Sequence, residues 1–188
     1  MDIRRLAQGL ATTKVQTLTL STGLNSLHIG RFPRLTSFIL DYSGPNPFMT
    51  IHRGCFGNVT TLKIQCIKAA LLMEGSIEGH RWRLSTLLRC LPSVRTLELE
   101  SGAVIEKCSI PAFIETIIIR PAEFDAVNWA QDHLRKLAAT TSALRYIELH
   151  QRNDWPVLTS WNEFEYFANK AGVKVVVKIK GQVWKVFE

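Results

Sequence analysis

The sequence predicts an α/β fold: an irregular solenoid with a curved parallel sheet on its concave face and helices and turns on its convex face. A phrase of the form apolar-x-x-apolar-x-apolar recurs along the chain. If its fourth residue is taken as a marker, the markers follow one another after 20, 24, 35, 20 and 30 residues. Crossovers of this length favour parallel strands. Short strands at such intervals are typical of stacked repeat units, because no single unit can bury its own apolar side.

Six segments carry the phrase, and each predicts one short strand: Val15–Leu20, Leu35–Leu40, Val59–Ile64, Val94–Leu99, Ile114–Ile119 and Leu144–Leu149. Alternation along a strand sends the last two apolar residues of each phrase to one face. The residues that we expect in the core are Leu18, Leu20, Leu40, Leu62, Ile64, Leu97, Leu99, Ile117, Ile119, Ile147 and Leu149. The residue before the marker is Thr or Ser in five of the six phrases. This favours a shared register, because Thr side chains on neighbouring strands pack and hydrogen-bond well.

The segments between the phrases differ in kind. Apolar residues at helical spacing predict amphipathic helices at 81–91 and 125–140. The segment Ser160-Trp-Asn-Glu163 has the form of a capping box, and it predicts the start of a third helix. We expect this helix to end at Gly172, because glycine adopts the left-handed conformation that closes many helices.

Two further segments near the C-terminus have strand character. Val173–Ile179 predicts a seventh strand, and Gln182–Phe187 is a candidate eighth strand. We expect residues 173–187 to cap the C-terminal end of the array.

Length and composition fit one domain. The chain has 188 residues, of which 46% are hydrophobic and 21% are charged, as in ordinary globular proteins. We therefore expect a single domain over residues 1–188, with the repeats at roughly 15–180. No apolar run approaches the length of a membrane span. The N-terminal residues lack the long apolar segment of a secretory signal, so we expect an intracellular protein, cytoplasmic or nuclear, without a membrane partner.

Two segments, Pro33–Leu40 and Leu91–Leu99, resemble the leucine-rich-repeat consensus in its LPxLxxLxL form. The irregular period, the Leu-Leu-x-x-Leu-Pro helix end and the closing Ala171-Gly-Val-x-Val segment are similar to the repeat region of fungal F-box-type proteins. The resemblance implies a recognition surface and, by analogy, substrate recognition in a ubiquitin-ligase-like context. Only fourteen residues precede the first phrase, so we expect no F-box here and no docking to a ligase adaptor through one.

The sequence carries no catalytic, cofactor or metal motif. It lacks a nucleophile elbow, a phosphate loop, a dinucleotide fingerprint and an HExxH segment. The four cysteines form no CxxC pair, which argues against a zinc or redox site. Cys66 and Cys90 lie in apolar stretches, so we expect both thiols to be reduced and buried. We predict a protein that is not an enzyme and has no cofactor.

Charged residues at the outward strand positions predict a binding surface for another protein. If the strands stack, Glu98, Glu100 and Glu148 share the concave sheet, and Arg120 lies between them. A local acidic strip on a protein of net charge +7 favours a partner with a basic patch. A solvated face with charges that alternate by chance is the other interpretation. The predicted partner-binding residues, all near outward positions of the sheet, are Asp41, Lys63, Glu98, Glu100, Arg120, Tyr146, Glu148 and His150.

Nucleic-acid binding is the alternative function. The sequence pI is about 9.5, and alternation places Lys174, Lys178 and Lys180 on one side of the C-terminal strand. Trp184 lies nearby as a stacking group for a base. The same lysines also suit the end strand of a solenoid, where charged side chains block edge-to-edge aggregation.

Overall fold

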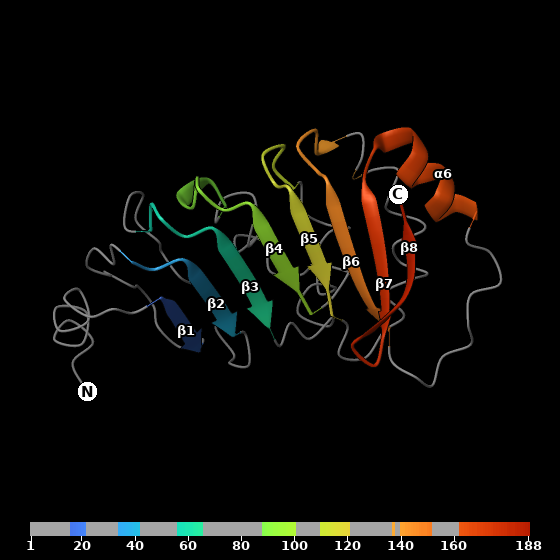
Figure 1. The fold of residues 1–188 in the computed structure, drawn as a ribbon. Coiled ribbons are helices and arrows are strands. Elements are labelled where there is room, and N and C mark those ends of the chain that lie inside the picture. Colours follow the sequence, from blue (N-terminus) through green and yellow to red (C-terminus); the bar gives the residue numbers. More distant parts are fainter. Residues whose placement is uncertain are drawn as a thin grey trace, which may run out of the picture. The chain divides into compact units, whose positions relative to one another are not determined.

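The computed structural model describes residues 16–21, 34–41, 56–65, 88–100, 110–120, 137, 140–151 and 162–188. The chain divides into two units, Met1–Val94 and Arg95–Glu188. The described residues contain eight strands and the helix α6 (Figure 1). Both units are built mainly on parallel strands, which confirms the α/β class.

The first unit contains a parallel sheet of three strands. β1 (Thr17–Ser21) pairs with β2 (Ser37–Asp41), and β2 pairs with β3 (Thr61–Gln65). The pairing aligns equivalent positions of the repeated phrase. The residues before the markers, Thr17, Ser37 and Thr61, lie opposite one another, and so do the markers Leu18, Phe38 and Leu62. The register that the Thr and Ser pattern predicts is therefore confirmed in this unit.

The second unit continues the same pattern. β4 (Thr96–Leu99), β5 (Thr116–Ile119), β6 (Tyr146–Gln151) and β7 (Lys174–Ile179) are consecutive parallel neighbours. Their register again aligns equivalent positions, with Thr96 opposite Thr116, and Thr116 opposite Tyr146. The seventh strand predicted at 173–179 is thus confirmed with a shift of one residue at its start.

A tight turn precedes four of the six phrases, in both units. The N–H of the first apolar residue donates to the carbonyl three residues earlier: Val59 to Phe56 at 3.1 Å, Val94 to Leu91 at 3.1 Å, Ile114 to Pro111 at 3.2 Å and Leu144 to Thr141 at 3.1 Å. In four phrases, one carbonyl accepts two successive N–H groups from the next phrase. Gln16 accepts from Thr36 and Ser37, both at 3.0 Å, and Glu115 accepts from Arg145 and Tyr146, at 2.9 and 3.1 Å. The sequence repeat is therefore also a repeat of backbone hydrogen bonds.

The last strand departs from the parallel pattern. β8 (Gln182–Phe187) is antiparallel to β7, and two residues, Lys180 and Gly181, connect them. Both have positive φ, 53° and 77°, which is the requirement of a type I′ hairpin turn. The candidate eighth strand is confirmed, but it folds back on β7 instead of following a crossover. A β-bulge interrupts the pairing between Val177 and Lys178.

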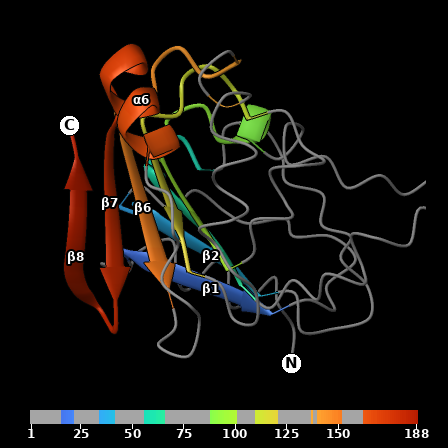
Figure 2. The same ribbon diagram turned by 90° about the vertical axis from the view of Figure 1, so that its right-hand side faces the viewer.

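The helix α6 (Asn162–Ala171) covers one face of the sheet near β7 (Figure 2). Among the side chains of α6 that the structure describes, Phe164 and Ala168 are buried, and the Phe164 ring stacks on Phe187 of β8 with the centroids 5.7 Å apart. Gly172 ends the helix with φ 62°, and its N–H donates to the Ala168 carbonyl at 2.9 Å. The expected glycine cap is confirmed.

The other predicted helices fall largely outside the described residues. Residues 88–90 are helical at the end of the segment 81–91, and residues 137 and 140 are helical at the end of the segment 125–140. Ser160 of the capping box also lies outside the described residues.

Among the described residues, the core consists of the apolar residues of the phrases and of the turns before them, together with apolar residues of α6, β7 and β8. The expected core residues that are fully buried are Leu62, Ile64, Leu97, Leu99, Ile117, Ile119, Ile147 and Leu149. Leu18 is only half-buried, and among the described strands β1 is the first in the sheet order and pairs with β2. The side chains of Leu20 and Leu40 lie outside the described residues. Cys90 is a free thiol, but it is half-buried, so the expectation of a buried cysteine was wrong there.

Candidate functional site

One face of the second unit carries a cluster of polar side chains. Glu98 of β4, Glu148 of β6 and Val176 of β7 occupy equivalent positions across the sheet, with Ile118 of β5 between the two glutamates. The neighbouring residues of each strand point to the opposite face, where Ile147 and Leu149 are buried in the core. Alternation thus separates a polar face from the apolar face on which α6 packs.

Glu148 is the centre of this cluster. The residue is only 6% exposed, and its carboxylate is surrounded by donors from its own strand and from β7. Tyr146 donates its hydroxyl proton to Oε2 at 2.9 Å, and the Lys178 ammonium lies 2.8 Å from the same oxygen. His150 Nε2 lies 2.5 Å from Oε1. Because an ionised carboxylate can only accept, this contact requires a proton on Nε2.

Arg120 connects this carboxylate to a second one. It follows β5 directly, and its backbone N–H donates to the Leu99 carbonyl at 2.8 Å, which holds the residue in strand-like pairing. The guanidinium Nε lies 2.9 Å from Glu98 Oε1, and Nη2 lies 3.8 Å from Glu148 Oε1. The Arg120 side chain is 44% exposed, whereas that of Glu98 is 14% exposed. Arg120 is therefore the accessible member of the cluster.

The hydrogen bonds determine the charge of Glu148. Burial alone would raise the pKa of this carboxyl, but the hydrogen bonds from Lys178, His150 and Tyr146 and the positive charge of Lys178 outweigh burial and lower the pKa from 4.5 to about 2. The same contact acts in the opposite direction on Tyr146. Burial, the hydrogen bond to Glu148 and the negative charge of Glu148 raise the pKa of the Tyr146 hydroxyl to about 12. Glu148 is therefore ionised and Tyr146 neutral over the physiological range.

The structure brings together five of the eight residues predicted for partner binding. Glu98, Arg120, Tyr146, Glu148 and His150 form the contacts described above. Glu100 is half-buried and follows β4 directly.

The other two predicted residues belong to the first unit. Lys63 is half-buried on β3, opposite Ile39. Asp41 is the last residue of β2, and its side chain lies outside the described residues.

Lys178 is the member that sequence reasoning assigned to another role. Its ammonium pairs with Glu148, and Lys174 pairs with Glu188. The strand that carries both lysines is not an end strand, since β6 and β8 flank it, so the interpretation of Lys174 and Lys178 as edge protection was wrong. Lys180 lies in the turn after the strand, not on its face. The parallel register that opposes Lys178 to His150 was the signal that could have placed Lys178 here.

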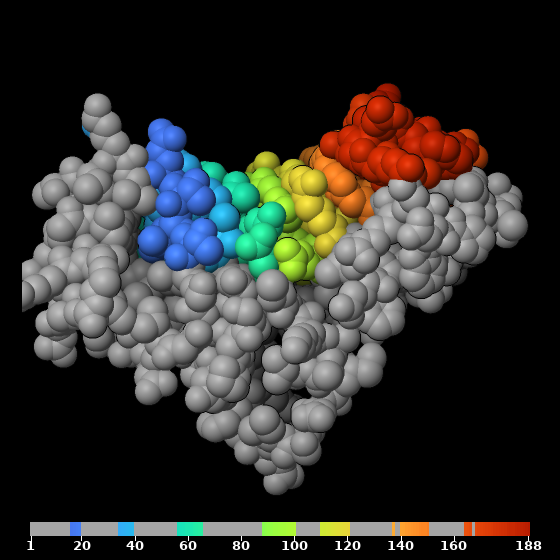
Figure 3. Space-filling model, turned by 90° about the horizontal axis from the view of Figure 1, so that it is seen from below, coloured from blue at the N-terminus to red at the C-terminus, as the bar shows by residue number. Residues whose placement is uncertain are grey.

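The cluster offers fixed hydrogen-bond donors and acceptors. Within the described ranges, no group of three or more His, Cys, Asp or Glu side chains is arranged to hold a metal ion. None of the described helical segments is both long enough and apolar enough to cross a membrane. The described residues of β5, β6 and the β7–β8 hairpin lie beside one another at the surface, in yellow, orange and red (Figure 3).

Comparisons of the chain with protein-family models, with curated proteins and with solved structures find no match.

Proposed function

We propose that this chain is a non-catalytic protein-interaction module that binds a protein partner on the polar face around Glu148. One observation carries the proposal: Tyr146, His150, Lys178 and Arg120 converge on a single buried carboxylate. Such a network holds side chains in place before a partner arrives. Binding then costs less conformational entropy than it would with mobile side chains.

Arg120 is the proposed anchor for the partner. Arginine and tyrosine are enriched among the residues that dominate binding energies at protein interfaces. A guanidinium has five N–H donors, and the two ion pairs of Arg120 involve only Nε and Nη2. The remaining donors lie on a side chain that is 44% exposed, where they suit a carboxylate or carbonyl oxygen of the partner.

The charge balance of the face bears on the choice of partner. Two carboxylates, Glu98 and Glu148, are matched by two cations, Arg120 and Lys178. The expectation of a partner with a basic patch rested on an acidic strip of Glu98, Glu100 and Glu148, and the pairing of Glu98 and Glu148 weakens it. We propose instead that directional hydrogen bonds, rather than net charge, select the partner at this face.

We further propose that both units belong to one leucine-rich-repeat-like solenoid, with the sheet on its concave side. The turn before a phrase and the carbonyl that accepts two N–H groups both occur in each unit, which supports a common repeat. Substrate recognition in a ubiquitin-ligase-like context is the setting that the sequence resemblance suggests.

The test is affinity purification of the tagged full chain from cell extract, followed by mass spectrometry, with two variants in parallel. Arg120→Glu and Arg95→Glu both reverse an arginine that is 44% exposed and paired with a glutamate, but only Arg120 belongs to the cluster. We expect the same partner proteins with the unmodified chain and with Arg95→Glu, and their loss with Arg120→Glu. Equal recovery with all three chains would refute this site. A cullin adaptor among the recovered proteins would support the ligase setting.

Nucleic-acid binding is the weaker candidate. Two of the lysines on which it rests are already paired, Lys174 with Glu188 and Lys178 with Glu148. Binding through several phosphates would weaken steeply with salt, with log K falling by about 0.9 per phosphate for each unit of log salt on duplex DNA. We expect no retention on single-stranded or duplex DNA columns at low salt. Retention with this salt dependence would favour the nucleic-acid alternative.

A further inference from the structure

The strand β8 is a second candidate interaction surface, separate from Arg120. It is the last strand in the sheet order and pairs with β7 on one side. Such a strand presents a row of N–H and C=O groups that can pair with another extended chain. Three of its apolar side chains are exposed: Val183 by 58%, Trp184 by 44% and Val186 by 41%.

The two faces of β8 differ in chemistry. Val183 is opposite Lys178, and Val186 is opposite Val176, so both valines lie on the face that carries Glu148. Lys185 is opposite the buried Val177, and its ammonium lies 4.8 Å from the centre of the Phe187 ring, on the face that α6 covers. An apolar strip therefore lies on one side of this edge, and a cation on the other.

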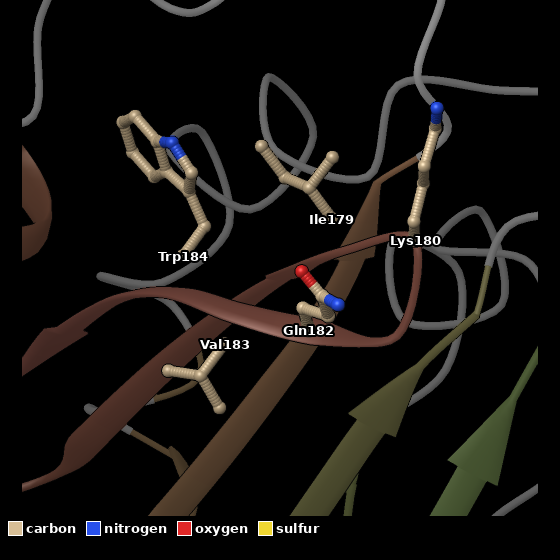
Figure 4. A pocket seen from close by; sticks show the side chains of 5 residues that line it. All are labelled: Ile179, Lys180, Gln182, Val183 and Trp184. Carbon is tan, nitrogen blue, oxygen red and sulfur yellow. The ribbon is translucent and has the colours of Figure 1, made fainter.

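A hollow of about 390 Å³ lies at the start of β8, beside the hairpin turn. Figure 4 shows Ile179, Lys180, Gln182 and Trp184 on one side of the strand, and Val183 pointing to the other side. The hollow thus combines apolar walls with one ammonium group. This combination fits a glutamate side chain, with its methylene groups against Trp184 and Ile179 and its carboxylate near Lys180.

The charge of the edge selects among the chains that could pair with it. Residues 180–187 contain two lysines, Lys180 and Lys185, and no acidic residue. A second copy of β8 would bring the same two lysines against them, and like charges on adjacent strands are destabilising. This favours an acidic strand of a different protein.

We propose that β8 binds an extended segment of a partner protein in which acidic and apolar residues alternate. The segment adds a strand beside β8. Its apolar side chains continue the strip of Val183 and Val186, and its carboxylates lie on the face of Lys185 and Lys180. The proposal is independent of the site at Arg120.

The test uses fluorescein-labelled peptides and fluorescence anisotropy with the full chain. The probe is a ten-residue peptide of alternating glutamate and valine. One control peptide has the same composition in two blocks, five glutamates and then five valines, and another has lysine in place of glutamate. Saturable binding of the alternating acidic peptide alone is expected. No binding of that peptide, or equal binding of the block peptide, would overturn the proposal.

Two chain variants test the role of charge. Lys185→Gln should weaken binding of the acidic peptide about fivefold, in line with the strength of an exposed charge pair. Lys170→Gln is the matched control, because it removes one exposed lysine from α6 and should leave the affinity unchanged. Equal effects of the two variants would show attraction to net charge alone and would refute the assignment to β8. Arg120→Glu should bind the peptide as the unmodified chain does, so the proposed function and this inference can fail separately.

Two further measurements test the pairing of strands. Successive N–H groups of a strand point to opposite edges of the strand. Two methylated peptides are therefore compared, one with a methyl group on the backbone nitrogen of every valine and one with it on that of every glutamate. One of the two peptides should lose binding, and the other should keep it. Undiminished binding of both methylated peptides would refute strand addition. Light scattering after size-exclusion chromatography should show a monomer. Dimer formation that Lys185→Gln enhances would identify a second copy of the chain as the occupant instead.

Discussion

Replacing Glu148 by glutamine should change the way in which stability depends on pH. Glutamine keeps the shape of the side chain and removes its charge. The pKa of Glu148 is lowered from 4.5 to about 2 in the folded chain. At about 1.4 kcal/mol for each pH unit, this difference corresponds to about 3 kcal/mol of folding free energy. The side chain is 8% exposed, so solvent screens this contribution little.

The sign follows from the direction of the pKa change. A carboxyl whose pKa is lower in the folded state than in the unfolded state stabilises the fold above the unfolded value of 4.5. This stabilisation is lost as the pH falls toward about 2. The difference in unfolding free energy between the natural chain and Glu148→Gln should therefore be largest at neutral pH. It should shrink by about 3 kcal/mol between pH 6 and pH 2.

Urea unfolding monitored by circular dichroism at several pH values between 2 and about 7 would measure this difference. Glu115→Gln is the control, because Glu115 forms an ion pair with Arg95 in which both side chains are about half exposed, 54% and 44%. Exposed pairs of this kind contribute at most about 1 kcal/mol, so the control curve should run close to that of the natural chain. Parallel curves for Glu148→Gln and the natural chain would refute the network as the cause of the low pKa.

Three further predictions concern single residues. In an alkaline titration followed by absorbance at 295 nm, one of the three tyrosines should ionise with a pKa of about 12. The variant Tyr146→Phe should lack that component of the titration. If all tyrosines ionised near 10, the hydrogen bond from Tyr146 to Glu148 would be wrong. Leu97→Ala should lower the unfolding free energy by about 2–5 kcal/mol in urea titrations, because Leu97 is fully buried, and a cost below 1 kcal/mol would exclude it from the core. Gly172→Ala should lower the unfolding free energy by about 1–2 kcal/mol, because alanine is strained at the positive φ of 62°. Gly57→Ala is the control: there is space for a methyl group, so the loss should be less than about 0.5 kcal/mol. Equal effects of the two substitutions on the melting temperature would contradict this account of the helix cap.

The strands and their register could be predicted because they depend on local and periodic signals. The apolar phrase has the two-residue alternation of a strand, and the Thr or Ser before each marker repeats with it. In the structure these positions align within both units, as Thr17 does with Ser37 and Thr96 with Thr116. The end of α6 could be predicted for the same reason, since the cap depends on Gly172 and on the helical turn just before it.

The polar face could be predicted only in part. Alternation alone places Glu98 and Glu148 on the same face of the sheet. Their burial and their partners were not predictable from a single strand, because they depend on which residues the neighbouring strands bring alongside. Lys178 pairs with Glu148 because β7 is next to β6 in a parallel register, 30 residues away along the chain. From the sequence, the lysines of β7 were interpreted as edge protection, with nucleic-acid binding as the alternative, because alternation along one strand does not show which residues lie on the next one.

The sequence by itself determined the elements of this protein: the short strands, their inward residues, the cap of α6 and the absence of a catalytic motif. Each follows from the chemistry of residues that are close together in the chain. The tertiary structure alone decided that β8 folds back on β7 as an exposed edge, and that Glu148 is ionised inside a network. A pKa is a property of an environment, and the environment of Glu148 is built by β6 and β7, strands that lie apart in the sequence and side by side in space.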